Sequence, residues 1–166
     1  MNTAAARKVI RPRTAARLCA VQALYQIEMR GGSAEHTITQ FLEYRIGEVV
    51  DGFDCRKTDT ALFGRIVRGT KTNQQQLDDL IAGSLTEDWT LARLDKILRV
   101  TLRAGTYELL YAPDVPVRVI LNEYVDIAHS FFEGAEPGLL NGILDRIGHL
   151  LRSGELEHQN ERATPQ

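Results

Sequence analysis

Residues 11–30, RPRTAARLCAVQALYQIEMR, restrict the fold more than any other stretch of the chain. After Arg17 the segment is almost entirely apolar: the consecutive residues Leu18, Cys19, Ala20 and Val21 point to different sides of a helix, so that hardly any polar face remains. A helix that is apolar nearly all round is buried by its neighbours. The segment therefore predicts a helix inside a helical bundle, and the glycine pair that follows it predicts its end.

Five further helices are predicted by apolar residues that recur every three or four positions, and no stretch shows the period-two alternation typical of strands. The 166 residues fit one domain or two small helical halves, and the apolar fraction of 43% is ample for a core. The fold class is thus predicted to be all-α. The helices are expected over residues 11–30, 33–46, 58–83, 91–112, 116–131 and 137–151, with a short turn at 86–89.

The basic residues of the N-terminus set it apart from the rest of the chain. The first 17 residues carry a charge of +5 and no acid, whereas the whole chain carries −2, so the remaining residues carry −7. Charge this localised serves an anionic partner or merely solubilises the N-terminus. The five cations are Arg7, Lys8, Arg11, Arg13 and Arg17.

A single nucleic-acid strand would suit this basic arm. Guanidinium groups can fork onto phosphates, while an amide and an aromatic ring, as in Gln22 and Tyr25, can hydrogen-bond to exposed bases or stack on them. Taken alone, Tyr25 is better explained as a tyrosine that packs between helices. The residues themselves thus lead to a helical protein with a candidate RNA or DNA arm.

No constellation of catalytic or metal-binding residues is visible. The paired acids at 78–79 and 87–88 are of the kind common on solvated helices and turns. The histidines occur in unrelated places and none pairs with a cysteine at ligand spacing. We therefore expect no enzyme, no metal and no cofactor; the absence of an apolar run of about 18 residues and the two lone cysteines favour a cytoplasmic, non-membrane protein. The histidines are His36, His129, His149 and His158.

Four passages, taken together and in this order, resemble the NusB family of bacterial transcription antitermination factors. The resemblance extends from Arg13 to about Leu151 and so covers most of the chain. The passages are AR and AVQALYQ at 16–17 and 20–26, LR and YEL at 102–103 and 107–109, VP and NE at 115–116 and 122–123, and LNGILD at 140–145.

The resemblance implies a NusB-like bundle of about six to seven helices without catalytic activity. A basic arm at 1–12 would precede a helical domain at 13–152, with packed subdomains at about 13–84 and 85–152, and a flexible polar tail would follow at 153–166. Family members bind the boxA element of ribosomal RNA leader transcripts as single-stranded RNA. They do so with the small-subunit ribosomal protein that doubles as Nus factor E, and the pair joins RNA polymerase antitermination complexes.

The resemblance also implies two sets of contact residues. RNA would be bound by Arg7, Lys8, Arg11, Arg13, Arg17, Gln22, Tyr25, Arg118, Phe131, Leu139 and Asn141, and the ribosomal protein by Leu98, Arg99, Arg103 and Tyr107.

The alternative function is that of a non-enzymatic protein-interaction module with an incidental basic arm, which binds the ribosomal protein or forms a homodimer.

Overall fold

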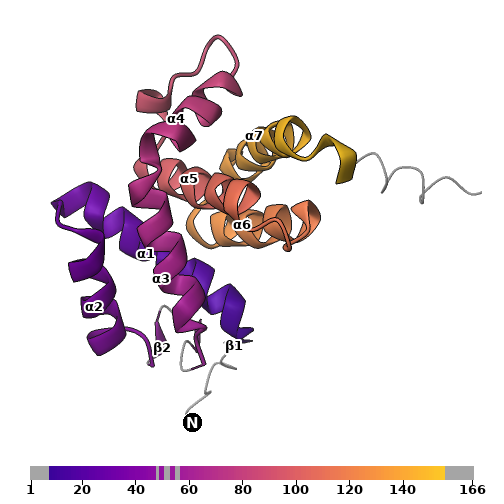
Figure 1. Cartoon of the computed structure of the whole chain (residues 1–166). Coiled ribbons are helices and arrows are strands. Elements are labelled where there is room, and N and C mark those ends of the chain that lie inside the picture. Colours follow the sequence, from indigo (N-terminus) through magenta and orange to yellow (C-terminus); the bar gives the residue numbers. More distant parts are fainter. Residues whose placement is uncertain (1–7, 48, 51–52, 55–56, 156–166) are drawn as a thin grey trace, which may run out of the picture. The chain divides into compact units, whose positions relative to one another are not determined.

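In the computed structural model of the chain, the fold is described for residues 8–47, 49–50, 53–54 and 57–155 (Figure 1). Helices account for most of these residues, and the all-α prediction is confirmed. The helices are α1 (Pro12–Arg30), α2 (Ala34–Tyr44), α3 (Thr60–Thr72), α4 (Gln74–Gly83), the 3₁₀-helix η1 (Leu91–Arg93), α5 (Lys96–Tyr111), α6 (Val117–Phe131) and α7 (Glu136–Leu151).

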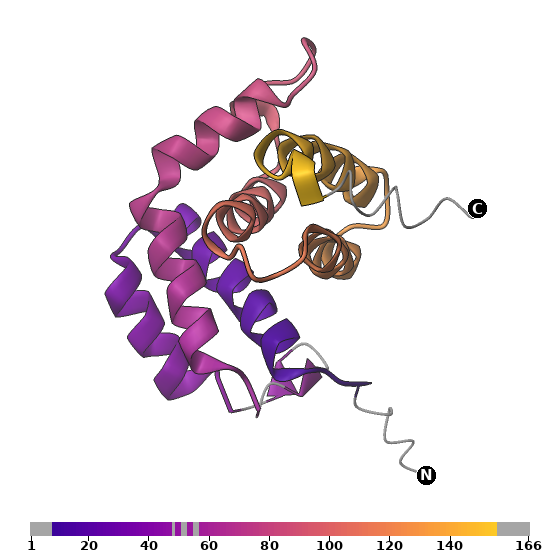
Figure 2. The same cartoon turned by 45° about the vertical axis from the view of Figure 1, so that its right-hand side comes forward.

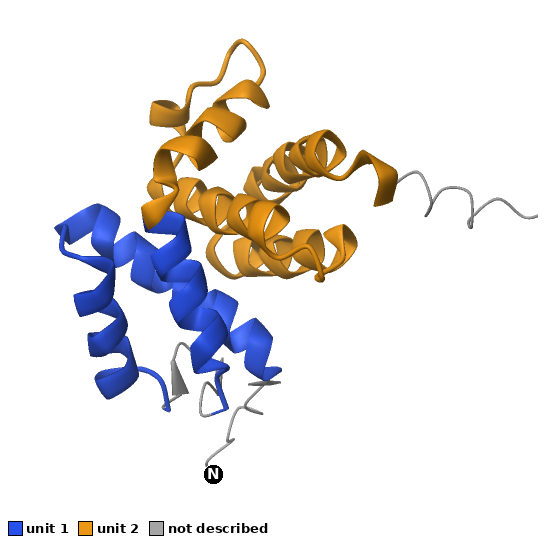
Figure 3. Ribbon diagram, viewed as in Figure 1, with its two compact units in different colours: residues 1–71 blue, residues 72–166 orange. Residues whose placement is uncertain are grey.

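The chain divides into two compact units, residues 1–71 and 72–166 (Figure 3). The sequence pattern predicted one helix over residues 58–83, although residues 69–76 are polar. The structure instead has two helices, α3 and α4, that meet at Asn73. The polar run at 69–76 therefore marks the end of one helix and the start of the next.

The first unit is built from α1, α2 and α3. Gly31 ends α1 at a φ of 75°, and its N–H donates to the carbonyl of Ile27, as the glycine pair predicted. Ser33 caps α2, because its hydroxyl accepts a hydrogen bond of 3.1 Å from the backbone N–H of His36. The rings of Phe41 and Phe63 stack 5.8 Å apart and join α2 to α3.

Three two-residue strands, which the sequence pattern did not predict, form a small sheet in the same unit. They are too short to show an alternating pattern. The strand order is β1-β3-β2, with β1 parallel and β2 antiparallel to β3. The strands are Lys8–Val9, Val49–Val50 and Phe53–Asp54.

The burial of α1 confirms that this helix is internal. Every residue from Ala15 to Val21 is buried, and so are Ala23, Leu24 and Ile27. Cys19 is a free cysteine within this run. The apolar character on all sides of the helix thus predicted its environment correctly.

In the second unit α5, α6 and α7 pack pairwise, and α4 packs on α5 and α7. Figure 2 shows α5, α6 and α7, coloured pink to yellow, side by side and nearly end-on. Asp95 caps α5 by accepting a hydrogen bond of 2.9 Å from the N–H of Ile97. This helix therefore begins at Lys96 rather than at 91. The largest fully buried side chains of the unit are Leu77, Ile81, Leu102, Leu109, Ile120, Tyr124, Leu140, Ile143 and Leu144.

Gly105 lets α5 approach its neighbours closely. A Cβ there would lie 3.0 and 3.1 Å from the two methyl carbons of Leu144 and 3.4 Å from the ring of Tyr124, and neither side chain has any exposed surface. Overpacking a core costs about 1–3 kcal/mol, more than the gain of about 1 kcal/mol from replacing a helical glycine by alanine. We therefore expect Gly105→Ala to lower the midpoint of urea unfolding.

Gly64 in α3 provides the matched control, because a Cβ there would meet only the guanidinium of Arg68, at 3.7 Å. Gly64→Ala is expected to raise the free energy of unfolding by up to about 1 kcal/mol through helix propensity. Equal stabilisation by both substitutions would show that Leu144 and Tyr124 move aside at no cost.

Candidate nucleic-acid interface

Two exposed arginines lie at the start of α1. Arg11 precedes the helix in an extended conformation, and Pro12 occupies its first turn, where the missing N–H of proline costs nothing. Arg13 follows on the surface. The first turn holds no acid, so these cations and the positive end of the helix dipole favour an anion together. Arg7 and the side chain of Lys8 lie outside the described residues.

Arg17 has a different environment from the other basic residues. Only 2% of its surface is exposed, and it lies within the buried run that begins at Ala15. Its position at the edge of the apolar segment was the one sequence signal for this burial. Among the described basic residues at the start of α1, the accessible ones are therefore Arg11 and Arg13.

Further along α1, Gln22 is half-buried and Tyr25 is 37% exposed. Residues three or four positions apart lie next to each other on a helix, so Gln22, Tyr25 and the exposed Met29 follow one side of α1. An amide and an aromatic ring are therefore accessible on the same helix that carries Arg11 and Arg13 at its start.

The second unit carries the other residues implied in RNA binding. Arg118 is exposed in the first turn of α6, which holds no acid. Phe131, the last residue of α6, is 38% exposed. Leu139 is half-buried and Asn141 is exposed in the first turns of α7, which begins a few residues after Phe131. An aromatic ring, an apolar side chain and an amide thus lie near the corner between α6 and α7.

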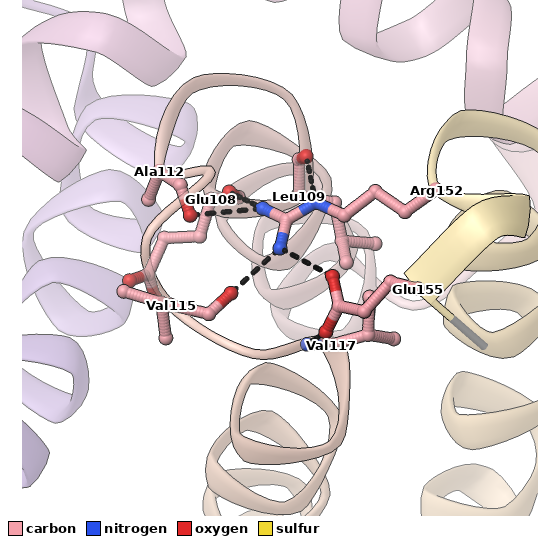
Figure 4. A network of polar contacts seen from close by, with 7 residues as sticks. All are labelled: Glu108, Leu109, Ala112, Val115, Val117, Arg152 and Glu155. Atoms are coloured by element: carbon pink, nitrogen blue, oxygen red, sulfur yellow. Dashed lines mark hydrogen bonds and ion pairs between the residues drawn. The ribbon is translucent and has the colours of Figure 1, made fainter. Parts of the chain in front are cut away.

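The connection between α5 and α6 is held by Arg152 and Glu155, which follow α7 (Figure 4). The side chain of Arg152 is 10% exposed, and its guanidinium donates to four backbone carbonyls. Glu155 accepts from the guanidinium at 3.4 Å and from the N–H of Val117 at 2.8 Å. The four carbonyls belong to Leu109 (2.9 Å), Val115 (2.6 Å), Glu108 (3.0 Å) and Ala112 (2.9 Å).

Sequence reasoning missed this network and placed the start of a flexible tail at residue 153. The only local signal is an arginine in the turn that ends α7, where cations favour helix carbonyls in any case. Its actual partners are about 40 residues away in the sequence, so no local pattern reveals them.

The residues implied in binding the ribosomal protein divide into buried and accessible ones. Leu98 is 2% exposed, in line with its spacing of four residues from the buried Leu94 and Leu102. Arg103 is also buried, and its guanidinium donates to both carboxylate oxygens of Asp78 at 2.6 and 3.0 Å. On the same helix, Arg99 and Tyr107 are half-buried and keep some accessible surface.

A second ion pair joins α2 to α3 on the surface of the first unit. Arg68 donates two hydrogen bonds to the carboxylate of Glu35, one of them 3.1 Å long. This bonding lowers the pKa of Glu35 and raises the pKa of Arg68. Because both side chains are well exposed, solvent screens the interaction.

The described residues hold neither a cluster of metal ligands nor a membrane-spanning helix. No three His, Cys, Asp or Glu side chains among them gather as potential ligands of a metal ion. Among the same residues no helix has both the length and the apolar character needed to cross a bilayer.

Comparison with known proteins gives consistent matches. The model of the NusB family matches residues 14–149. Proteins named transcription antitermination protein NusB from Sinorhizobium fredii and Caulobacter vibrioides are 49% and 48% identical to the chain, over 84% and 83% of its length and 88% and 93% of theirs.

Solved structures agree on the fold. The structure of T. maritima NusB has a TM-score of 0.72 and 32% identity, and the alignment covers 89% of this chain and 98% of that one. A structure of antitermination factors NusB and NusE with double-stranded RNA has a TM-score of 0.69 over 82% of this chain and 96% of that one. At 20% identity, this second likeness concerns the fold alone.

Proposed function

Since this chain belongs to the NusB family, we propose that it is an RNA-binding transcription antitermination factor that acts by binding alone. Its ligand would be boxA-type single-stranded RNA of ribosomal RNA operons. It would bind together with the small-subunit ribosomal protein that acts as Nus factor E and join RNA polymerase antitermination complexes in the cytoplasm. The observation that carries the proposal is the family match over 14–149, directly after exposed cations at the start of α1.

In this proposal phosphate contacts supply affinity and base contacts supply sequence preference. Arg11 and Arg13 would bind phosphates, with Arg7 and Lys8 extending the same arm, while Gln22 and Tyr25 would contact bases. The buried Arg17 would stabilise α1 rather than touch RNA. The second group of contacts, on α6 and α7, comprises Arg118, Phe131, Leu139 and Asn141.

The ribosomal protein would dock on the accessible part of α5. Arg99 and Tyr107 retain surface there, whereas the buried Leu98 and Arg103 would support the helix from inside. This division follows from burial, because a side chain that is 2% or 6% exposed offers a partner almost no area.

The test is the double substitution Arg11→Ala and Arg13→Ala in the full chain. Binding would be followed by fluorescence anisotropy with a boxA-like single-stranded RNA and a scrambled RNA of equal length, over a salt series, with and without the ribosomal protein. Each phosphate neutralised on a single strand contributes about 0.7 to the logarithmic salt slope, so the double variant should reduce the slope by about 1.4.

A charge-matched control replaces two exposed cations elsewhere, Arg65 on α3 and Lys96 on α5, by alanine. This control should retain the slope and the preference for boxA. If Arg11→Ala/Arg13→Ala also leaves RNA affinity unchanged, or if both RNAs bind alike, the basic arm is incidental. The chain is then a protein-interaction module, and its binding of the ribosomal protein and its oligomeric state become the properties to measure.

A further inference from the structure

We propose that residues 152–155, here called the C-terminal strap, position Arg118 for RNA contact. The proposal rests on the RNA-binding function above and adds two positioning residues, Arg152 and Glu155. Both lie beyond residue 149, where the match to the family model ends. Neither is proposed to touch RNA.

The first step of the argument is the convergence of carbonyl groups on Arg152. The last carbonyls of a helix have no partner within the helix and must be satisfied otherwise. The guanidinium of Arg152 donates hydrogen bonds to the carbonyls of Glu108 and Leu109 at the end of α5. It also donates to those of Ala112 and Val115 in the connection (Figure 4). One planar group therefore fixes the path of the chain from α5 to α6.

The second step is the start of α6. Pro116 precedes this helix without a capping side chain, and no acid lies in the first turn. Glu155 provides what is missing, because its carboxylate accepts the N–H of Val117 at 2.8 Å while Arg152 holds the same carboxylate at 3.4 Å. The strap thus caps α6 from a segment 38 residues further along the chain.

The third step concerns Arg118, which directly follows Val117. Its side chain is exposed, so the backbone of the first turn is what aims it. Without its cap the first turn of α6 would fray, and the guanidinium of Arg118 would then have to be ordered when RNA binds. This ordering costs conformational entropy and so weakens binding. Loss of the strap should therefore weaken the contact of Arg118 without removing any group that binds RNA.

The experiment compares Arg152→Met, Glu155→Leu and Glu155→Gln in the full chain, each with Arg118 present and with Arg118→Ala. Binding of the boxA-like single-stranded RNA would be measured by anisotropy at one salt concentration, below the unfolding temperature of every variant. Backbone amide exchange at residues 117–120 would report on the first turn of α6 in the absence of RNA.

We expect Arg152→Met and Glu155→Leu each to raise Kd by about three- to tenfold, the range typical of weakening one charge-assisted contact. Amide exchange at 117–120 should become faster in both variants. Glu155→Gln should stay within about twofold of the parent, because an amide oxygen can still accept from Val117. In the Arg118→Ala background all three should change Kd by less than about twofold, since the aimed group is gone.

The two main variants remove charges of opposite sign, which separates positioning by the strap from simple electrostatic attraction. Arg152→Met removes a cation and Glu155→Leu removes an anion, so electrostatic attraction alone predicts opposite changes in RNA affinity. Opposite changes, or equal effects with and without Arg118, would overturn the proposal. Should Arg152→Met be too unstable to assay, Glu155→Leu and Glu155→Gln decide alone.

Failure of the proposed function gives a different pattern. If the parent protein does not bind boxA-like RNA, both proposals fall together. If it binds and Arg118→Ala binds equally well, only the strap proposal falls, because there is then no contact for the strap to position.

Discussion

Arg152→Met is expected to lower the free energy of unfolding by about 3–5 kcal/mol, the usual cost of removing one partner from a buried charged network. Four carbonyls at the end of α5 and in the following connection lose their charged donor, and the carboxylate of Glu155 loses its counter-ion. Urea unfolding of the full chain, followed by circular dichroism, measures the change.

Arg146→Met is the matched control. Arg146, on α7 itself, also donates to a carbonyl, that of Ser84 at 3.0 Å, but its side chain is exposed and this is its one hydrogen bond to the described residues. Its replacement should cost no more than about 0.5 kcal/mol. Equal losses for Arg146→Met and Arg152→Met would mean that the convergent carbonyls are satisfied by water once the guanidinium is removed.

Asp78→Ala is expected to cost about 3 kcal/mol, because it deprives the buried guanidinium of Arg103 of two charge-assisted hydrogen bonds. The double variant Asp78→Ala/Arg103→Met should regain much of this loss, since an apolar side chain of similar length needs no counter-ion. A double-mutant cycle by urea unfolding isolates the interaction of the pair. Additive losses would show that Arg103 is stabilised mainly by other groups.

The exposed pair Glu35–Arg68 provides the comparison for Asp78–Arg103. Arg68 lowers the pKa of Glu35, so this pair adds stability above the unfolded pKa of the carboxyl, and the contribution is lost as the pH falls through the lower, folded pKa. Because solvent surrounds both groups and screens the interaction, Glu35→Gln should lower the unfolding midpoint only slightly at neutral pH, far less than Asp78→Ala does. A shift as large as that of Asp78→Ala would contradict the role of burial.

The helix ends that depend on local chemistry could be predicted from the sequence. Gly31 and Ser33 end α1 and begin α2 where their residue types suggested. The apolar spacing also gave α6 and α7 to within one or two residues. By contrast, η1 and the start of α5 were missed, because Leu91 and Leu94 continue the apolar spacing although Asp95 caps a new helix.

The candidate interface could be predicted less well than the fold, because composition does not reveal burial. Arg17 and Arg103 count as cations in any sum of charges, yet both are nearly inaccessible. The cap of α6 could not be predicted either, because the capping group, Glu155, lies far away in the sequence. Charge thus identified the basic N-terminal segment, whereas packing decides which of the cations are accessible.

Arg152 has a consequence for the rates of folding as well as for stability. Its hydrogen bonds to the four carbonyls join groups 37 to 44 residues apart, so the chain must close a long loop before any of these four forms. Interactions that form after the rate-limiting step slow unfolding rather than speed folding. The strap should therefore slow unfolding and lengthen the lifetime of the folded second unit. The rate at which α5, α6 and α7 first assemble should remain nearly unchanged.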